Sequence, residues 1–86
     1  MPFYRTRIVV RDCEQWTGDN EDFLAEKFGE DILFTWGEIP GTLNASIWVE
    51  ANQEWLDIEV GEWIIKDSLG IYPCKDEVFR EKYEEL

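Results

Sequence analysis

Two short runs place aromatic, hydroxyl and cationic side chains next to one another in an acidic chain. Trp16 and Thr17 stand in the run QWTG, and Tyr72 and Lys75 stand in the run YPCK. An indole ring can stack on a flat ligand, a hydroxyl can donate a hydrogen bond, and a lysine ammonium binds phosphate as a point charge. These residue types indicate a binding site for a small, ring-containing, phosphorylated ligand.

Both runs also have a structural interpretation, which the sequence leaves open. Trp16 would then fill the core and Thr17 would cap a turn. Pro73 would end strand pairing, Cys74 would pack as a small hydrophobic residue, and Asp76 would cap a final helix.

Basic residues gather at the N-terminus. Arg5, Arg7 and Arg11 are three of the eight Lys and Arg residues, and residues 1–11 contain no Asp or Glu. A free arginine stripe would favour an anionic ligand, whereas a paired one would only neutralise carboxylates of the protein itself. Arg5 and Arg7 therefore join the ligand-binding candidates, with the structural alternative open.

The segment that follows is strongly acidic. Between residues 12 and 31 the one basic residue is Lys27, and the whole chain has a formal net charge of −12. Such a charge opposes binding to nucleic acid and to anionic membranes at long range. The simple interpretation is a solvated face, and the alternative is a surface that binds a basic partner or imitates DNA. The candidate residues for partner binding are Asp19, Glu21, Asp22, Glu26 and Glu30.

Composition argues against several kinds of chemistry. The chain has no His, which removes a histidine general base. Without His or a CxxC pair, a zinc site is not expected. We expect no enzyme activity, no metal and no cofactor. Cys13 and Cys74 are expected to be free thiols, with a disulfide as the alternative.

Length and hydropathy predict one domain over residues 1–86. No apolar run approaches the roughly 20 residues of a membrane-spanning helix, and the N-terminus lacks the pattern of a signal peptide. The expected location is the cytoplasm of the host cell, with no membrane partner.

Alternating apolar and polar residues predict an antiparallel sheet. A first strand at residues 3–13 would turn Tyr4, Thr6, Ile8 and Val10 toward the core. Further strands are expected at residues 32–36, 46–50, 55–60, 61–66 and 71–75. In the third of these, Leu56, Ile58 and Val60 would point inward, and Pro73 confines the last to an edge or a bulge.

Helical spacing predicts a helix within residues 19–31, capped by Asp19 or Asn20 and ended by Gly29. Its inward side would carry Phe23, Leu24, Lys27 and Phe28, and residues 76–86 predict a short C-terminal helix. The fold class is therefore α+β, with a small curled antiparallel sheet of about four to six strands and one packed helix.

Two segments carry a family resemblance. YRTRIVVRDCEQWTGDN, residues 4–20, and GEWIIKDSLGIYPCKDEVFREKYEE, residues 61–85, resemble a widespread group of small proteins encoded by bacteriophages and prophages. Members of that group open with a pattern like YRKKPVVVEAxQWTGxN and close with one like PGDWIIKGxxGEFYPCKPDIFxxTYE. The resemblance covers about half of the chain and keeps QWTG and YPCK intact. The chain departs from the patterns at Ile8, at residues 60–62 and at Asp76.

The resemblance implies a small, cytoplasmic, non-structural phage product, and such proteins often act against host defence. We expect a non-enzymatic accessory protein that evades host immunity by sequestering a small nucleotide-type defence signal, cyclic or linear. QWTG and YPCK would then lie close together, on neighbouring first and last strands, and a homo-oligomer is among the expected assemblies.

Two alternatives stay open. One is an acidic inhibitor or nucleic-acid mimic, anti-CRISPR-like, that blocks a basic host defence protein. The other is a phage accessory protein with no role against defence. Direct nucleic-acid binding is not expected.

Overall fold

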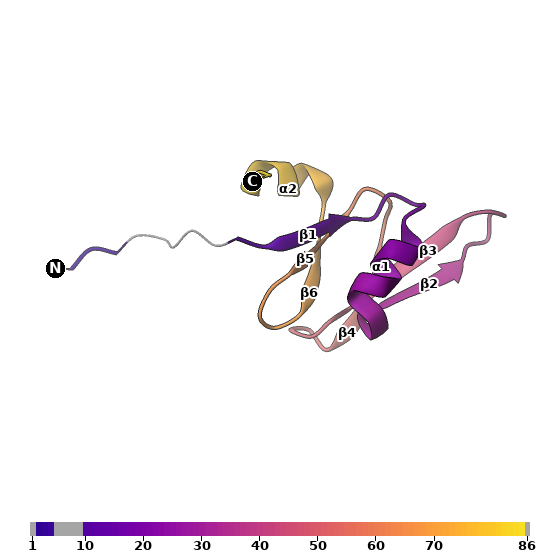
Figure 1. The fold of residues 1–86 in the computed structure, drawn as a ribbon, viewed down its shortest axis with the longest axis horizontal. Helices are drawn as coiled ribbons and strands as arrows, with labels where there is room; N and C mark the ends of the chain where they lie inside the picture. The colour runs from indigo at the N-terminus through magenta and orange to yellow at the C-terminus, as the bar shows by residue number, and fades with distance from the viewer. Residues whose placement is uncertain (1, 5–9, 86) are drawn as a thin grey trace.

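In the computed structural model the chain forms two antiparallel sheets and two α-helices over the residues that the structure describes, 2–4 and 10–85 (Figure 1). Sheet A has the strand order β1-β5-β6 and sheet B the order β2-β3-β4. This arrangement confirms the α+β class. The elements in chain order are β1 (Asp12–Gln15), α1 (Glu21–Phe28), the 3₁₀ turn η1 (Gly29–Asp31), β2 (Ile32–Trp36), β3 (Leu43–Val49), β4 (Glu54–Ile58), β5 (Trp63–Lys66), β6 (Ile71–Cys74) and α2 (Asp76–Lys82).

The strands divide into two sheets because both edges of β5 are occupied. β1 pairs with one edge, so that Cys13 faces Ile65, and β6 pairs with the other, so that Tyr72 faces Ile65. β4 therefore cannot join β5, although the two strands follow each other in the sequence. Pro73 lies on β6, at the edge of sheet A, where its missing N–H breaks no ladder.

Sheet A is covered on both of its faces. Ile64 and Ile65 are consecutive in β5 and point to opposite sides, yet they are 0% and 1% exposed. Ile64 belongs to the core that also contains α1 and sheet B. Ile65 shares its face with Trp63, whose ring is stacked on Phe79 of α2. This double burial explains why β5 reads as a continuous apolar run, WII.

Sheet B shows the alternation expected of a sheet with one wet face. In β3, Ala45, Ile47 and Val49 are buried, whereas Ser46 and Trp48 between them are half-buried. Ile47 lies opposite Ile32 of β2 and Leu56 of β4. The inner face packs against α1 and sheet A in one core, in which β3 lies against β6.

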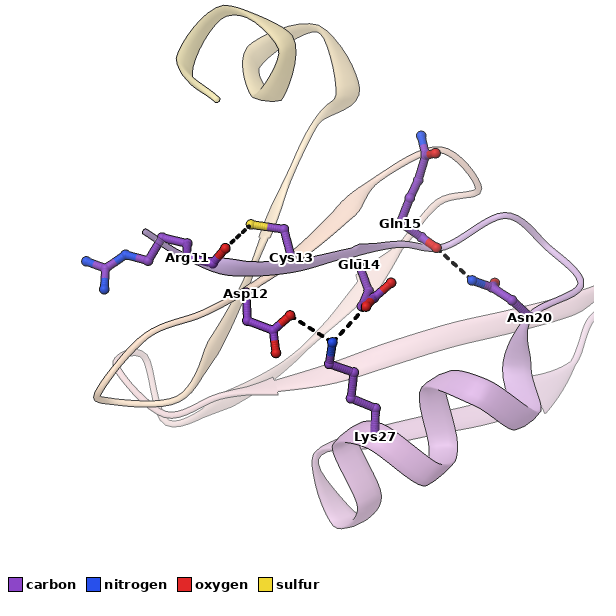
Figure 2. A network of polar contacts seen from close by, with 7 residues as sticks. All are labelled: Arg11, Asp12, Cys13, Glu14, Gln15, Asn20 and Lys27. Atoms are coloured by element: carbon purple, nitrogen blue, oxygen red, sulfur yellow. Dashed lines mark hydrogen bonds and ion pairs between the residues drawn. The ribbon is translucent and has the colours of Figure 1, made fainter. Parts of the chain in front are cut away.

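Helix α1 covers the core with Leu24 and Phe28, which are 0% and 8% exposed, whereas Phe23 is 51% exposed. Gly29 ends the helix with a φ of 55°, a conformation that favours glycine. Asn20 is the N-cap residue as expected, but its side chain turns away from the helix. Its amide nitrogen donates to the carbonyl of Gln15 at 2.8 Å and so fixes the helix to the end of β1 (Figure 2).

Lys27 of α1 faces β1 and not the apolar core. Its ammonium group donates to Asp12 at 2.8 Å and to Glu14 at 2.7 Å (Figure 2). These two carboxylates point to the same side of β1, whereas Cys13 and Gln15 point to the other side, toward α2. The ion pairs therefore join helix and strand across the rim of the core.

Three details of the expected strands were wrong. Residues 10 and 11, expected in the first strand, lie outside β1, and Tyr4 and Val10, expected on the core face, are 92% and 68% exposed. The ladder with β5 begins at Asp12, which pairs with Lys66, the last residue of β5. Thr6 and Ile8 lie outside the described residues. Val60 is 62% exposed because β4 ends at Ile58, where the alternation stops.

Asp76 does not cap α2, as its position in the sequence suggested. Lys75 is the N-cap residue, and neither its side chain nor that of Asp76 makes a cap hydrogen bond. The Asp76 carboxylate instead accepts the Trp63 indole N–H at 2.9 Å and the Arg80 Nε–H at 2.9 Å. Asp76 thereby fixes the first turn of α2 to sheet A.

We expect Trp16→Ala to destabilise the fold strongly. Its ring is 1% exposed and packs against Phe34 with 5.2 Å between ring centroids. Removing a buried aromatic side chain costs about 3–5 kcal/mol, which urea denaturation followed by circular dichroism would measure. Trp36→Ala is the matched control, because Trp36 is 76% exposed and should change stability by less than about 0.5 kcal/mol. Equal losses in the two variants would contradict this assignment.

Candidate functional site

Trp16 lies in the core and presents no ring face to a ligand. Its backbone N–H donates to the carbonyl of Glu62 at 2.9 Å, and its carbonyl accepts from Gly61 at 2.7 Å. Gly18, with a φ of 93°, packs against Val60, and a Cβ there would lie 3.3 Å from a Val60 methyl group. The QWTG run therefore joins β1 to the start of β5, and the expected stacking role of Trp16 is replaced by packing.

Thr17 is exposed, and its hydrogen-bonding groups are used within its own turn. The hydroxyl donates to Asp19 at 2.7 Å, and the backbone N–H donates to the Asn20 side chain at 3.0 Å. This is the turn-forming role that the sequence left open for Thr17.

Tyr72 and Lys75 do not share a site. The Tyr72 hydroxyl lies 3.5 Å from the Tyr83 hydroxyl of α2. That hydrogen bond and partial burial raise the pKa of Tyr72 to about 12. The side chain of Lys75 is exposed, and its carbonyl accepts the Phe79 N–H at 2.9 Å as α2 begins. Arg5 and Arg7 lie outside the described residues.

The two motifs meet indirectly, because β5 separates their strands. The Gln15 side chain donates to the carbonyl of Gly61 at 3.0 Å and to the Asp76 carboxylate at 3.4 Å. Trp63 donates to the same carboxylate oxygen. A polar cluster therefore connects the residue before Trp16 with the residue after Lys75, through β5. This cluster gives the QWTG and YPCK runs a structural role.

A groove of about 950 Å³ opens between β1 and α2. Its volume lies in the range of small-molecule sites, roughly 300–1,000 Å³. It combines a thiol, three aromatic rings and three cationic side chains, and it is the site that we regard as the candidate. The residues that line it are Val10, Arg11, Asp12, Cys13, Trp63, Phe79, Arg80, Lys82, Tyr83, Glu84 and Glu85.

The wall that α2 contributes is a stack of aromatic rings. Trp63 and Phe79 are nearly parallel, 5° apart, with centroids 3.8 Å from each other. Phe79 and Tyr83 follow at 4.9 Å and 15°. Phe79 and Tyr83 are four residues apart, a spacing that places side chains on the same side of a helix. That Trp63 completes the stack follows only from the tertiary structure.

Basic residues gather along this groove, together with an equal number of acidic residues. The structure describes six of the eight basic residues, and three of them, Arg11, Arg80 and Lys82, line the groove. Arg80 also pairs with Asp76. Among the acidic residues at the groove, Asp12 is paired with Lys27, while Glu84 and Glu85 line its C-terminal end. The sequence placed Arg11 in the arginine stripe but not among the ligand-binding candidates, and it gave no signal for Arg80 and Lys82.

Cys13 lines the groove as a thiol. Burial raises its pKa above 9.0, and the neighbouring Asp12 acts in the same direction. Both cysteines are free. Cys13 on β1 and Cys74 on β6 are two strand spacings apart, about 9.6 Å, whereas a disulfide needs Cα atoms within about 7 Å. The backbone therefore does not allow the alternative of an internal disulfide.

A second, smaller pocket of about 290 Å³ lies where the β3–β4 turn meets the β5–β6 turn. Its walls are mainly apolar and include Val49, Leu56 and Ile71, with Asn52 and Asp67 among the polar residues. It contains none of the cationic side chains found in the groove.

The acidic candidates for partner binding gather at α1. Asp19, Asp22, Glu26 and Glu30 are exposed and Glu21 is half-buried. Lys27, the basic residue of this segment, is directed toward β1. The acidic residues of this segment are therefore exposed to solvent, apart from the half-buried Glu21.

No three His, Cys, Asp or Glu side chains cluster in a way that could hold a metal ion within residues 2–4 and 10–85. Over the same residues, none of the helices has the length and apolar character needed to cross a membrane.

The Tyr72 hydroxyl gives a testable dependence of stability on alkaline pH. Its folded-state pKa of about 12 lies above the usual value of 10.0, so the folded state holds the phenolic proton more tightly than the unfolded state. This contribution to stability is complete below pH 10.0 and is lost as the pH rises to about 12. Denaturation at a series of alkaline pH values should show a shallower loss for Tyr72→Phe than for the wild type. An equal loss of stability in the two proteins would contradict the assignment of this pH dependence to Tyr72.

No family model, curated protein or solved structure matches this chain.

Proposed function

We propose that this protein is a non-enzymatic phage accessory protein that evades host immunity by binding and sequestering a small nucleotide-type defence signal. The groove between β1 and α2 is the binding site. One observation carries the proposal: three of the six described basic residues of an acidic chain converge on one groove beside a stack of three aromatic rings. The phage context comes from the sequence resemblance.

The groove offers complementary chemistry for both parts of a nucleotide. Arg11 is exposed and can form two parallel hydrogen bonds to a phosphate, and Lys82 can add a point charge. A base can contact the aromatic wall around Tyr83, since stacking of a base on an aromatic ring is worth about 1–3 kcal/mol. The site therefore differs from the one predicted around Trp16 and Lys75, while the class of ligand is the same.

The net charge of −12 does not prevent local binding of an anion. Screening at physiological salt reduces the repulsion of charges beyond about 8 Å. The acidic residue nearest to Arg11 in the sequence, Asp12, is bonded to Lys27 at 2.8 Å. A phosphate would contact Arg11 directly. The strength of that contact therefore depends more on nearby charges, such as the paired Asp12, than on the total charge of the chain.

The groove favours binding over catalysis. Cys13 is its one thiol, and burial raises the pKa of that thiol above 9.0. A thiolate is the nucleophilic form of cysteine. At neutral pH Cys13 is therefore a protonated thiol that lines the groove and is not an activated nucleophile.

The test is a thermal-shift panel of cyclic and linear nucleotides with the full chain. A bound ligand raises the melting temperature by mass action. Arg11→Gln should weaken binding of that ligand about tenfold, because a hydrogen bond to a charged group is worth about 1.5–3 kcal/mol. Lys66→Gln is the matched control: it removes one positive charge at an exposed residue that does not line the groove, and it should leave binding unchanged.

Two outcomes would contradict the proposal. A flat thermal response to the whole panel would reject sequestration of those compounds. Loss of binding in Lys75→Gln with full binding in Arg11→Gln would move the site to the YPCK run.

The acidic alternative has a separate signature. An inhibitor of a basic defence protein would bind its target in a salt-sensitive manner, and charge reversal at Asp22 and Glu26 would abolish that binding. Both residues are exposed on α1, so the double variant should fold and should leave nucleotide binding in the groove unchanged.

A further inference from the structure

The outer face of sheet B is bare. Its inner face packs on the core, whereas Leu33, Ser46 and Asp57 lie in one row across the outer face, and Trp48 and Trp55 lie in a second row. No described helix or strand covers these residues, since α1 contributes Leu24 and Phe28 to the opposite, inner side. We use the name outer face for these five residues.

Two tryptophans dominate this outer face. Their rings meet edge to face, with centroids 5.6 Å apart and planes at 62°. Trp55 is 42% exposed, and Leu33 in the neighbouring row is 52% exposed. Ser46 in the neighbouring row is the smallest of the five residues. The indole rings are therefore the largest groups on the outer face.

The tryptophans are flanked by carboxylates. Asp57 follows Trp55 by two residues on the same face of β4, and it accepts a hydrogen bond from Ser46 at 2.6 Å. Glu50 accepts the Trp48 indole N–H at 2.6 Å. Hydrogen bonds from Trp48 and Gln53 lower the pKa of Glu50, which keeps that carboxylate ionised at neutral pH.

No positive charge of sheet B itself balances these carboxylates. From residue 28 to residue 65 the chain contains no Lys or Arg, and it contains eight Asp and Glu. All of β2, β3 and β4 falls within that stretch. A partner must therefore bring the positive charge, and nucleic acid or a second copy of this acidic chain would instead be repelled.

We infer that the outer face of sheet B docks a basic polypeptide segment of a partner protein. An Arg or Lys side chain of that segment lies over the faces of Trp48 and Trp55, and Glu50 and Asp57 pair with its charge. Tryptophan is the best aromatic partner for such cations, and Trp55, at 42% exposed, is open to one. This surface is separate from the groove between β1 and α2, and it does not depend on the function proposed for that groove.

The probe is a synthetic Arg-rich peptide, with a matched peptide in which every Arg is replaced by Gln. Titration into the full chain, followed by the indole N–H signals in NMR spectra, reports on each tryptophan. The signals of Trp48 and Trp55 should shift with the Arg peptide alone, and the signal of Trp36, exposed at the end of β2, should stay in place.

Paired variants separate this face from the overall negative charge. Trp55→Ser and Asp57→Asn should each weaken binding about fivefold, the effect of losing one cation–π or charged contact. Trp36→Ser and Glu81→Gln are the controls, because they remove an indole and a carboxylate from exposed residues outside the face. If Trp55→Ser fails to fold, the pair Asp57→Asn and Glu81→Gln with the NMR shifts decides the question.

Three results would overturn the inference. Equal weakening by Asp57→Asn and Glu81→Gln would mean that only the net charge attracts the peptide. Equal affinity for the Arg and Gln peptides would exclude recognition of cations. A self-association that Trp55→Ser abolishes, measured by sedimentation, would assign the face to a second copy of this chain.

Discussion

The fold depends on the occupation of both edges of strand β5. β1 arrives from the N-terminal part of the chain to pair with one edge, and β6 pairs with the other. This central position buries Ile64 on one face and Ile65 on the other, so both faces of sheet A need cover. Trp16 and α1 lie on the core side, and α2 lies on the far side with Phe79 stacked on Trp63. The groove exists because β1 and α2 border the same covered face.

Local patterns predicted most elements but not their partners. The strands β2, β4, β5 and β6 and helix α1 follow from short-range alternation and helical spacing, which depend on neighbours in the sequence. The length of β1 does not, because it is set by the four residues of β5 with which it pairs. The same dependence on distant residues explains why the sequence predicted the binding site at other residues. The sequence made Trp16 a candidate for ligand stacking because its burial depends on distant residues such as Phe34. Arg80 gave no signal because only the docking of α2 brings it to the groove that Arg11 also lines.

The charges of this protein are segregated by element. The described cations Arg11, Arg80 and Lys82 border the groove, while sheet B lies within a stretch that has no Lys or Arg. At physiological salt, charges more than about 8 Å apart are largely screened from each other, so the field at each surface depends mainly on its own nearby charges. The net charge of −12 alone would have suggested one uniform, repulsive surface toward anions.

The groove between β1 and α2 and the outer face of sheet B also belong to different parts of the sequence. Residues 4–20 and 61–85 contain sheet A and α2, and they are joined by the hydrogen bonds of Gln15 and Trp63 to Asp76. All of sheet B comes from the intervening residues. Its outer face carries cross-strand contacts of its own, such as Ser46 to Asp57 and Trp48 to Trp55, and lies opposite the buried core. Substitutions in the Gln15–Trp63–Asp76 cluster act on the docking of α2 and therefore on the groove itself, because Phe79 and Tyr83 of α2 form part of its wall.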